Sequence, residues 1–337
     1  MNISEIGKFA FLDRLNAGFE VGQQSTVKAF DDAAVIAVSD KPKQVCSVIL
    51  LEGIHFNLVY TPLKHLGYKA VTHAVSKIVA MNALPQQILV SASVSSRFDV
   101  SDVESFYEGI RCACSGYSVD LVENNLTASM TGMTISVTAV GEASDDSLCY
   151  KNEAKVNDLV CISGSLGAAY MGLQVLERER RIFESNHTQP KLDGYDYILQ
   201  KQLRPQARLD MLKTFEDNGI KPSSMTNIAD GLASDILHIC KQSGVGVRIY
   251  LEKIPIAAET FEVCGEMNFD AVTAALNGGD DFELLFTVPI SEYEAIKSLS
   301  GFEIIGYIAD ESQGAYLVTP EGNELKIKAQ GWTFVTG

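Results

Sequence analysis

The stretch NIADGLASDILHICKQSGVGVRIYL, residues 227–251, decides the fold class because it contains a complete helix and the strand that follows it. Gly244 is placed to end the helix, and VGVRIYL after it is typical of a strand. Apolar residues recur before Gly244 at helical spacing and predict one buried helix face: Leu232, Ile236, Ile239 and Cys240. A helix that leads directly into a strand indicates a fold that mixes helices and strands.

The same mixture extends in both directions along the chain. We expect a mixed α/β fold. The predicted helices cover 3–18, 62–83, 100–117 and 165–181, with a further helical stretch to 218. The predicted strands cover 33–39, 45–51, 86–95, 132–143, 159–164, 282–289, 302–309 and 314–320. The helix at 62–83 is rich in small residues, which predicts close packing across a sheet. Ser101 and Glu104 have capping-box spacing and are expected to open the third helix.

With 337 residues, the chain is more than twice as long as a domain of about 100–150 residues, so two domains are expected. The polar run at 143–157 interrupts the pattern of helices and strands. We place the boundary there, which gives domains 1–148 and 149–337.

Charge and composition exclude several classes of partner. Lys and Arg total 27 against 43 Asp and Glu, and the formal net charge of −16 repels nucleic acid and anionic membranes. There is no apolar run of membrane-spanning length and no signal-peptide core at the N-terminus. We expect a soluble, cytoplasmic protein. Its seven scattered cysteines are typical of buried thiols, and the pair Cys112 and Cys114 is only a weak zinc motif.

Acidic residues at the ends of elements are the strongest candidates for chemistry. Paired carboxylates in turns can hold Mg²⁺ against phosphate groups, although acids also favour turns for backbone reasons alone. Neither G-x-x-x-x-G-K-[ST] nor a strand followed by G-x-G-x-x-G is present, so phosphate binding would need another scaffold. The candidates are Asp31, Asp32, Glu52, His55, Asp230, Asp235, Asp280, Asp281 and Glu283.

Seven stretches that follow one another along nearly the whole chain carry a family resemblance: AFDDAAV (29–35), LLEGIHF (50–56), AVSKIVAMNALP (74–85), LVENNLTAS (121–129), NIADGLASDILHI (227–239), NGGDDFELLFT (277–287) and GWTF (331–334). Together they resemble the thiamine-monophosphate kinase family, which belongs with aminoimidazole ribonucleotide synthetase and selenophosphate synthetase. The resemblance implies a two-domain α/β fold that binds ATP without a P-loop and forms homodimers through the sheet of its N-terminal domain. It also implies transfer of the ATP γ-phosphoryl group to thiamine monophosphate, giving thiamine diphosphate, with aspartate-bound Mg²⁺ neutralising charge.

The resemblance assigns roles residue by residue. Asp32 and Asp230 match catalytic aspartates, and Asp31, Asp32 and Asp230 match metal positions. Contacts to thiamine monophosphate are implied for His55, Asp280 and Trp332. Residues at the cofactor positions are Ser47, Lys77, Asn124, Asn125 and Lys151.

Four carboxylates that the family patterns contain are replaced in this sequence by Val48, Lys77, Asn125 and Asn227. Four lost negative charges and one gained positive charge alter the site by about five charge units, and one opposite pair at about 4 Å near a protein surface is worth roughly 4 kcal/mol before desolvation. We therefore expect most high-affinity Mg²⁺ binding to be lost. Alternatively, Lys77 takes the place of a metal ion and pairs with Asp32 or Asp230.

Three functions remain open. The chain is a kinase homologue with a degenerate metal site that still binds a phosphorylated small molecule. Otherwise it is an active phosphotransferase that uses Asp31, Asp32, Asp230 and Asp235, or a non-catalytic partner that dimerises through its N-terminal sheet.

Overall fold

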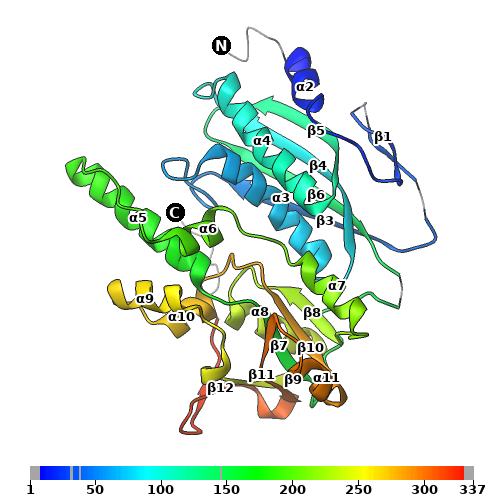
Figure 1. Cartoon of the computed structure of the whole chain (residues 1–337), viewed down its shortest axis with the longest axis vertical. Coiled ribbons are helices and arrows are strands. Elements are labelled where there is room, and N and C mark those ends of the chain that lie inside the picture. Colours follow the sequence, from blue (N-terminus) through cyan, green and yellow to red (C-terminus); the bar gives the residue numbers. More distant parts are fainter. Residues whose placement is uncertain (1–7, 31–32, 38, 145, 330–337) are drawn as a thin grey trace. The chain divides into compact units, whose positions relative to one another are not determined.

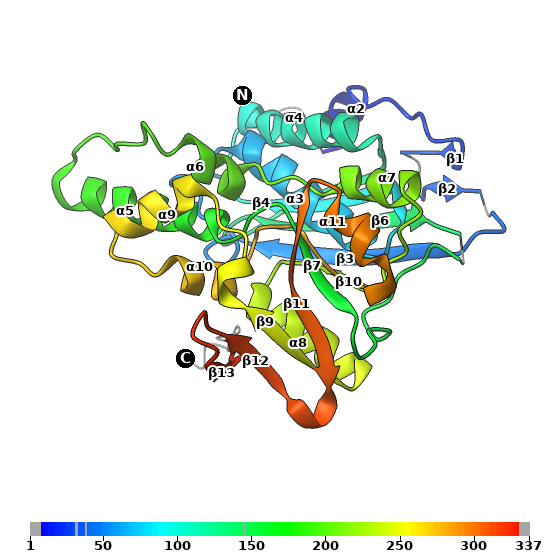
Figure 2. The same ribbon diagram turned by 60° about the horizontal axis from the view of Figure 1, so that its bottom comes forward.

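A computed structural model describes residues 8–30, 33–37, 39–144 and 146–329 (Figures 1 and 2). The chain divides into two compact units, each with its own sheet. The first unit comprises Met1–Val79 and Ala83–Ser147, and the second comprises Ala80–Asn82 and Leu148–Gly337. Helices and strands alternate in both units, which confirms the mixed α/β class.

The first unit is built on a four-stranded sheet of order β3-β6-β4-β5, in which only β4 and β5 run parallel. Helix α3 packs against β3, β6 and β4, and α4 lies beside it (Figures 1 and 2). A short ribbon of β1 and β2 and the helix α2 complete the unit. The bounds are α2 Lys8–Asn16, β1 Thr26–Lys28, β2 Val35–Ile36, β3 Lys43–Leu51, α3 Leu63–Val79, β4 Leu84–Val94, α4 Val100–Tyr117, β5 Asp120–Ala128 and β6 Thr134–Glu142.

Two glycines explain the close approach of α3 and α4. A Cβ on Gly67 would overlap the carbonyl oxygen of Phe106, and a Cβ on Gly109 would overlap that of Lys64. The backbones of the two helices therefore touch, which requires glycine at both positions. This contact confirms that small residues let the helix predicted at 62–83 pack closely.

The N-terminus of α4 differs from the expected capping box. Asp99 is the N-cap, its side chain accepts from the Asp102 backbone N–H at 3.1 Å, and the Asp102 side chain accepts from the Asp99 backbone N–H at 3.0 Å. Capping by Ser101 and Glu104 is therefore wrong. Glu104 forms an ion pair with Arg14 instead.

The second unit is built on a seven-stranded sheet of order β13-β12-β9-β11-β7-β10-β8. Its pairings are antiparallel except for β12 with β9. The bounds are β7 Leu159–Ser163, α5 Ala168–Asn186, α6 Asp196–Leu203, α7 Leu209–Asp217, β8 Ser224–Asn227, α8 Leu232–Ser243, β9 Val245–Tyr250, η1 Leu251–Lys253, α9 Ala258–Glu266, α10 Ala271–Asn277, β10 Leu284–Val288, η2 Ile290–Glu292, α11 Tyr293–Lys297, β11 Phe302–Asp310, η3 Glu311–Gln313, β12 Ala315–Val318 and β13 Glu324–Lys326.

The core of the second unit includes the helix and strand predicted at 227–251. Leu232, Ile236 and Ile239 are fully buried in α8, and Gly244 ends it in a left-handed conformation with φ +65°. Strands β7, β8 and β10 are buried along their whole length. The turns that adjoin β8, α8 and β10 are therefore anchored to buried elements.

The seven cysteines are all free thiols. Cys114 is buried and Cys112 is partly exposed, and burial raises the pKa of Cys114 to about 12. In the described ranges, no three His, Cys, Asp or Glu side chains form a group that could hold a metal ion. No helix of this part of the chain is long and apolar enough to cross a membrane.

Candidate functional site

Two acidic turns that are distant in sequence lie side by side in the second unit. The backbone N–H of Asp280 donates to the carbonyl of Ala229 at 2.9 Å, and the N–H of Phe282 donates to the carbonyl of Ile228 at 2.9 Å. In return, the N–H of Ile228 donates to the carbonyl of Glu283 at 2.7 Å. These bonds bring Asp280, a predicted substrate residue, next to the turn that holds Asp230.

Glycines make this close approach feasible. Gly231 and Gly279 have φ values of +92° and +73°. A Cβ on Gly279 would lie 2.5 Å from the Ala229 carbonyl oxygen, so glycine is required for its space as well as its conformation. Asp280 itself has φ +57°, a conformation that Asp tolerates better than most residues.

Asp235 organises the turn that contains Asp230. Its carboxylate accepts from the backbone N–H groups of Ala229 at 3.1 Å and Asp230 at 3.2 Å. Burial, reinforced by the nearby charge of Asp230, raises the pKa of Asp235 to about 7, and Lys151 partly opposes this shift. Lys151, a predicted cofactor residue, is therefore electrostatically coupled to this site.

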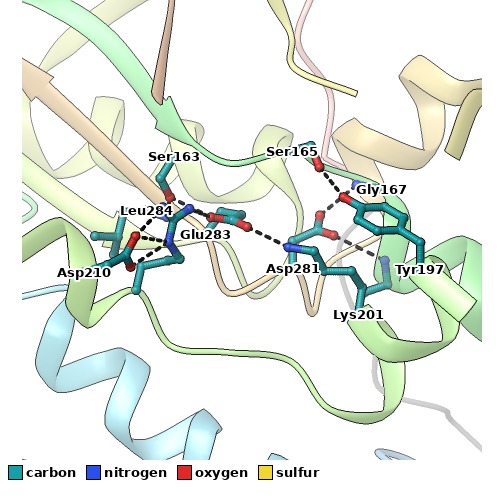
Figure 3. Close-up of polar contacts among 11 residues, drawn as sticks. Ser163, Ser165, Gly167, Tyr197, Lys201, Asp210, Asp281, Glu283 and Leu284 are labelled. Carbon is teal, nitrogen blue, oxygen red and sulfur yellow. Dashed lines mark hydrogen bonds and ion pairs between the residues drawn. The ribbon is translucent and has the colours of Figure 1, made fainter. Parts of the chain in front are cut away.

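Asp281 and Glu283, the other two acids of the NGGDDFELLF stretch, are buried, and their polar contacts are drawn in Figure 3. Asp281 is buried and accepts from the N–H groups of Gly167 at 2.9 Å and Ala169 at 3.4 Å, at the start of α5. Burial raises the pKa of Asp281 to about 7 in spite of these bonds. The side chain of Asp281 is thus committed to packing and hydrogen bonding within the unit.

Glu283 is the centre of a buried charged network in the same view (Figure 3). It accepts from Ser163 Oγ at 2.8 Å and forms ion pairs with Lys201 at 3.1 Å and with Arg208. Arg208 also binds Asp210 at 2.8 Å. Sequence reasoning identified Glu283 but missed Lys201 and Arg208, because no local spacing links them to residue 283.

In the first unit, three predicted positions lie toward the helix-covered face of the sheet. Val48 and Asn124 lie in one row across the sheet, through Val137 and Val90. Lys77 is exposed in the last turn of α3, and its charge lowers the pKa of Cys46, although burial raises that pKa overall. Cys46 shares the strand face of Val48 by alternation.

Asn124 is already engaged in this interior. Its Oδ1 accepts from the Tyr107 hydroxyl, and its Nδ2 donates to Asn16 Oδ1 at 2.8 Å. Desolvation raises the pKa of the buried Tyr107 hydroxyl above its ordinary value. Any ligand contact by Asn124 would have to replace these bonds.

Ser47 and Asn125 lie on the opposite face of the sheet. The Ser47 hydroxyl accepts from Thr138 Oγ1 at 3.1 Å, and Asn125 is exposed. The predicted cofactor residues of the first unit therefore do not share one face. His55 is exposed in the loop after β3, where its Nδ1 accepts from the Leu51 backbone N–H at 3.0 Å, which leaves the imidazole proton on Nε2.

Three predicted residues, Asp31, Asp32 and Trp332, lie outside the described residues. The proposed pairing of Lys77 with Asp32 or Asp230 therefore stays a prediction. Within the described part of the first unit, Lys77 forms no ion pair.

Two described residues that the resemblance aligns with metal ligands, Val48 and Asn227, are poor ligands for a hard cation. Val48 has no donor atom for a metal ion, and the side-chain nitrogen of the buried Asn227 is without a hydrogen-bond partner among described residues. Asp235 has its carboxylate engaged with two backbone N–H groups and carries a raised pKa. Hard cations need several ionised or carbonyl oxygens, whereas the Val48 side chain offers none and the Asn227 side chain offers one neutral oxygen.

Comparison with known proteins places this geometry in a family. Residues 30–143 match the family model "AIR synthase related protein, N-terminal domain". The thiamine-monophosphate kinase of Aquifex aeolicus is 30% identical over 98% of this chain and 99% of that protein. The chain belongs to the thiamine-monophosphate kinase family.

Solved structures of thiamine-monophosphate kinases agree with the assignment. The enzyme from Stenotrophomonas maltophilia matches with a TM-score of 0.79 and 26% identity, over 92% of this chain and 96% of that chain. The structure of AaThiL complexed with AMPPCP and TMP matches with a TM-score of 0.75 and 29% identity, over 99% of both chains. The expected two-domain fold, related to aminoimidazole ribonucleotide synthetase, is thereby confirmed.

Proposed function

We propose that this protein binds thiamine monophosphate or a close phosphorylated relative, and transfers phosphate from ATP weakly or not at all. The supporting observation is the arrangement on the helix-covered side of β3. There, Val48 occupies a family metal position, and the ammonium of Lys77 lies close enough to influence Cys46 on the same strand face. A lysine ammonium in this region disfavours Mg²⁺ through like-charge repulsion.

The substrate side supports retained binding. Asp280 lies beside the turn of Asp230, and His55 presents an Nε2–H that is a suitable donor to a phosphate oxygen. A similar structure, AaThiL, was solved complexed with AMPPCP and TMP. We therefore assign thiamine monophosphate as the ligand, with His55, Asp280 and Trp332 as its contacts because their sequence motifs resemble those of the family.

Two measurements test the proposal. Calorimetric titration with thiamine monophosphate should show binding, and mass spectrometry after incubation with ATP and Mg²⁺ should show little thiamine diphosphate beside an active homologue. Turnover comparable to that of the homologue would refute the loss of metal chemistry. Absence of binding from a cooperatively folded protein would refute the substrate assignment.

Restoring the family carboxylates separates a degenerate kinase from an active one with other ligands. The double variant Val48→Asp and Lys77→Asp, at the two positions that lie toward the helix-covered face of the sheet, should raise turnover if the site has degenerated. It should lower turnover or leave it unchanged if the remaining acids already hold the metal. A matched control replaces Lys77→Asp by Lys297→Asp, since both lysines are exposed in the last turn of a helix.

A second role, as a dimer partner, is favoured by the exposed face of β3. Val45 is 66% exposed and Ile49 is 57% exposed on the same strand face. Such an apolar sheet face is suited to pairing with a second copy. Sedimentation should show a dimer that Ile49→Glu weakens, and a strict monomer at micromolar concentration would exclude this role.

A further inference from the structure

Glu283 connects the acidic turn at 277–283 to other elements of the second unit. Glu283 is 2% exposed, and its carboxylate is held by Ser163 at the end of β7 and Lys201 in α6 (Figure 3). Arg208, the N-cap residue of α7, forms the third contact. A carboxylate with partners on three separate elements has little freedom to move.

The space around this carboxylate is also closed. Gly164 has φ +59°, and a Cβ there would overlap both carboxylate oxygens of Glu283. The Ser163 hydroxyl that donates to Glu283 also accepts from the Leu284 backbone N–H at 2.8 Å. Ser163 therefore holds both the Glu283 side chain and the Leu284 backbone N–H.

Backbone hydrogen bonds connect Glu283 directly to the candidate site. The Glu283 carbonyl accepts from Ile228, and the next two bonds, from Phe282 to Ile228 and from Asp280 to Ala229, continue the same ladder. Asp280 lies three residues from Glu283, and Ala229 immediately precedes Asp230. A shift of Glu283 would thus change the separation of Asp280 and Asp230.

We propose that Glu283, held by Lys201 and Arg208, is a positioning residue that sets the affinity for the phosphorylated substrate by fixing Asp280 beside Asp230. The proposal rests on the proposed function, which makes Asp280 a substrate contact. The negative charge of Glu283 is central to this role, because removing one member of a buried ion pair leaves the charge of its partners without compensation. Arg208 keeps Asp210 as a partner, so Lys201 is the cation most affected.

The first test is Glu283→Gln, which keeps the size of the side chain and removes its charge. We expect the Kd for thiamine monophosphate to rise at least about tenfold, and amide hydrogen exchange to accelerate in both 227–231 and 277–283. The matched control is Glu324→Gln, which removes the partner of Arg248, another buried cation of the same unit. The control should leave the Kd within about twofold and exchange in these two segments unchanged.

Lys201→Met provides a second, independent perturbation, since the Lys201 side chain is 30% exposed and better tolerates replacement. It should weaken binding in the same direction, and the double variant should lose less than the product of the two single effects. If Glu283→Gln fails to fold, Lys201→Met alone decides the proposal. Fully multiplicative effects would overturn the coupling of the two residues.

The outcomes separate this proposal from the proposed function. Unchanged exchange in 277–283 for a folded Glu283→Gln protein would overturn positioning. Accelerated exchange with an unchanged Kd would reduce Glu283 to a purely structural role and overturn it as well. If the wild-type protein does not bind thiamine monophosphate, the proposed function fails and the role of Glu283 in affinity fails with it, whereas the two preceding outcomes overturn only the role of Glu283.

Discussion

Asp235→Asn should make the stability of the protein less dependent on pH. Asp235 is 6% exposed, and burial together with Asp230 raises its pKa from 3.8 to about 7. The difference corresponds to about 4 kcal/mol, at about 1.4 kcal/mol for each tenfold change in proton affinity. The unfolded chain ionises this group above pH 4, whereas the folded chain holds the proton until about pH 7.

Proton linkage determines whether the free energy of unfolding rises or falls with pH. Between pH 4 and pH 7 the folded state binds more protons at Asp235 than the unfolded state, so the free energy of unfolding falls as pH rises. Asparagine does not ionise, and its Oδ1 can accept the same N–H bonds from Ala229 and Asp230. The stability of the variant relative to wild type should therefore rise by up to about 4 kcal/mol between pH 4 and pH 8.

Urea unfolding followed by circular dichroism in a chelating buffer at several pH values measures this difference. Asp193→Asn makes the same charge change at an exposed position and should show no such trend. Asp230→Asn should weaken the fall in stability with pH that Asp235 causes, because it removes a charge that raises the Asp235 pKa. A difference between Asp235→Asn and wild type that stays flat or falls with pH would refute the assignment of a raised pKa.

The packing of the first unit gives two further predictions. Asp99→Ala should cost about 1 kcal/mol in urea unfolding because it removes the α4 cap, whereas Glu104→Ala should cost less than about 0.5 kcal/mol; the reverse order would contradict the observed cap. Gly67→Ala should lower stability by about 3 kcal/mol or more because its methyl group would overlap the Phe106 carbonyl. Gly116→Ala in α4 meets only an atom 3.9 Å away and should be neutral or stabilising, so equal losses for the two variants would exclude a steric cause.

The elements that sequence predicts well are those with a complete local signal. Helix α8 has an apolar face and a glycine that ends it, and α3 has a long face of small residues. Strand β8, Ser224–Asn227, was missed because it is short and largely polar, and it becomes a strand through its pairing with β10. Strand β5 was recognised only as a family motif, since its polar residues alternate with buried ones on a half-exposed sheet.

The cap of α4 shows a second reason for error. Two overlapping patterns, Asp99 with Asp102 and Ser101 with Glu104, have the same spacing. The start of the helix decides between them, and sequence patterns locate helix ends poorly. Similarly, the acids of the site were identified by residue type, but Lys201 and Arg208 are brought to Glu283 only by the tertiary fold.

The acids at 280–283 differ in their roles: Asp280 is the proposed substrate contact, and Asp281 and Glu283 have structural contacts. Asp281 and Glu283 are held in the interior by α5, Ser163, Lys201 and Arg208, and these contacts are sufficient to retain both acids whether or not the protein catalyses a reaction. The family positions at Val48 and Lys77 belong to the other unit, where their replacement leaves these contacts in place. The loss of metal ligands that we propose for the first unit is thus compatible with buried acids in the second unit, because the contacts of Asp281 and Glu283 do not depend on Val48 or Lys77.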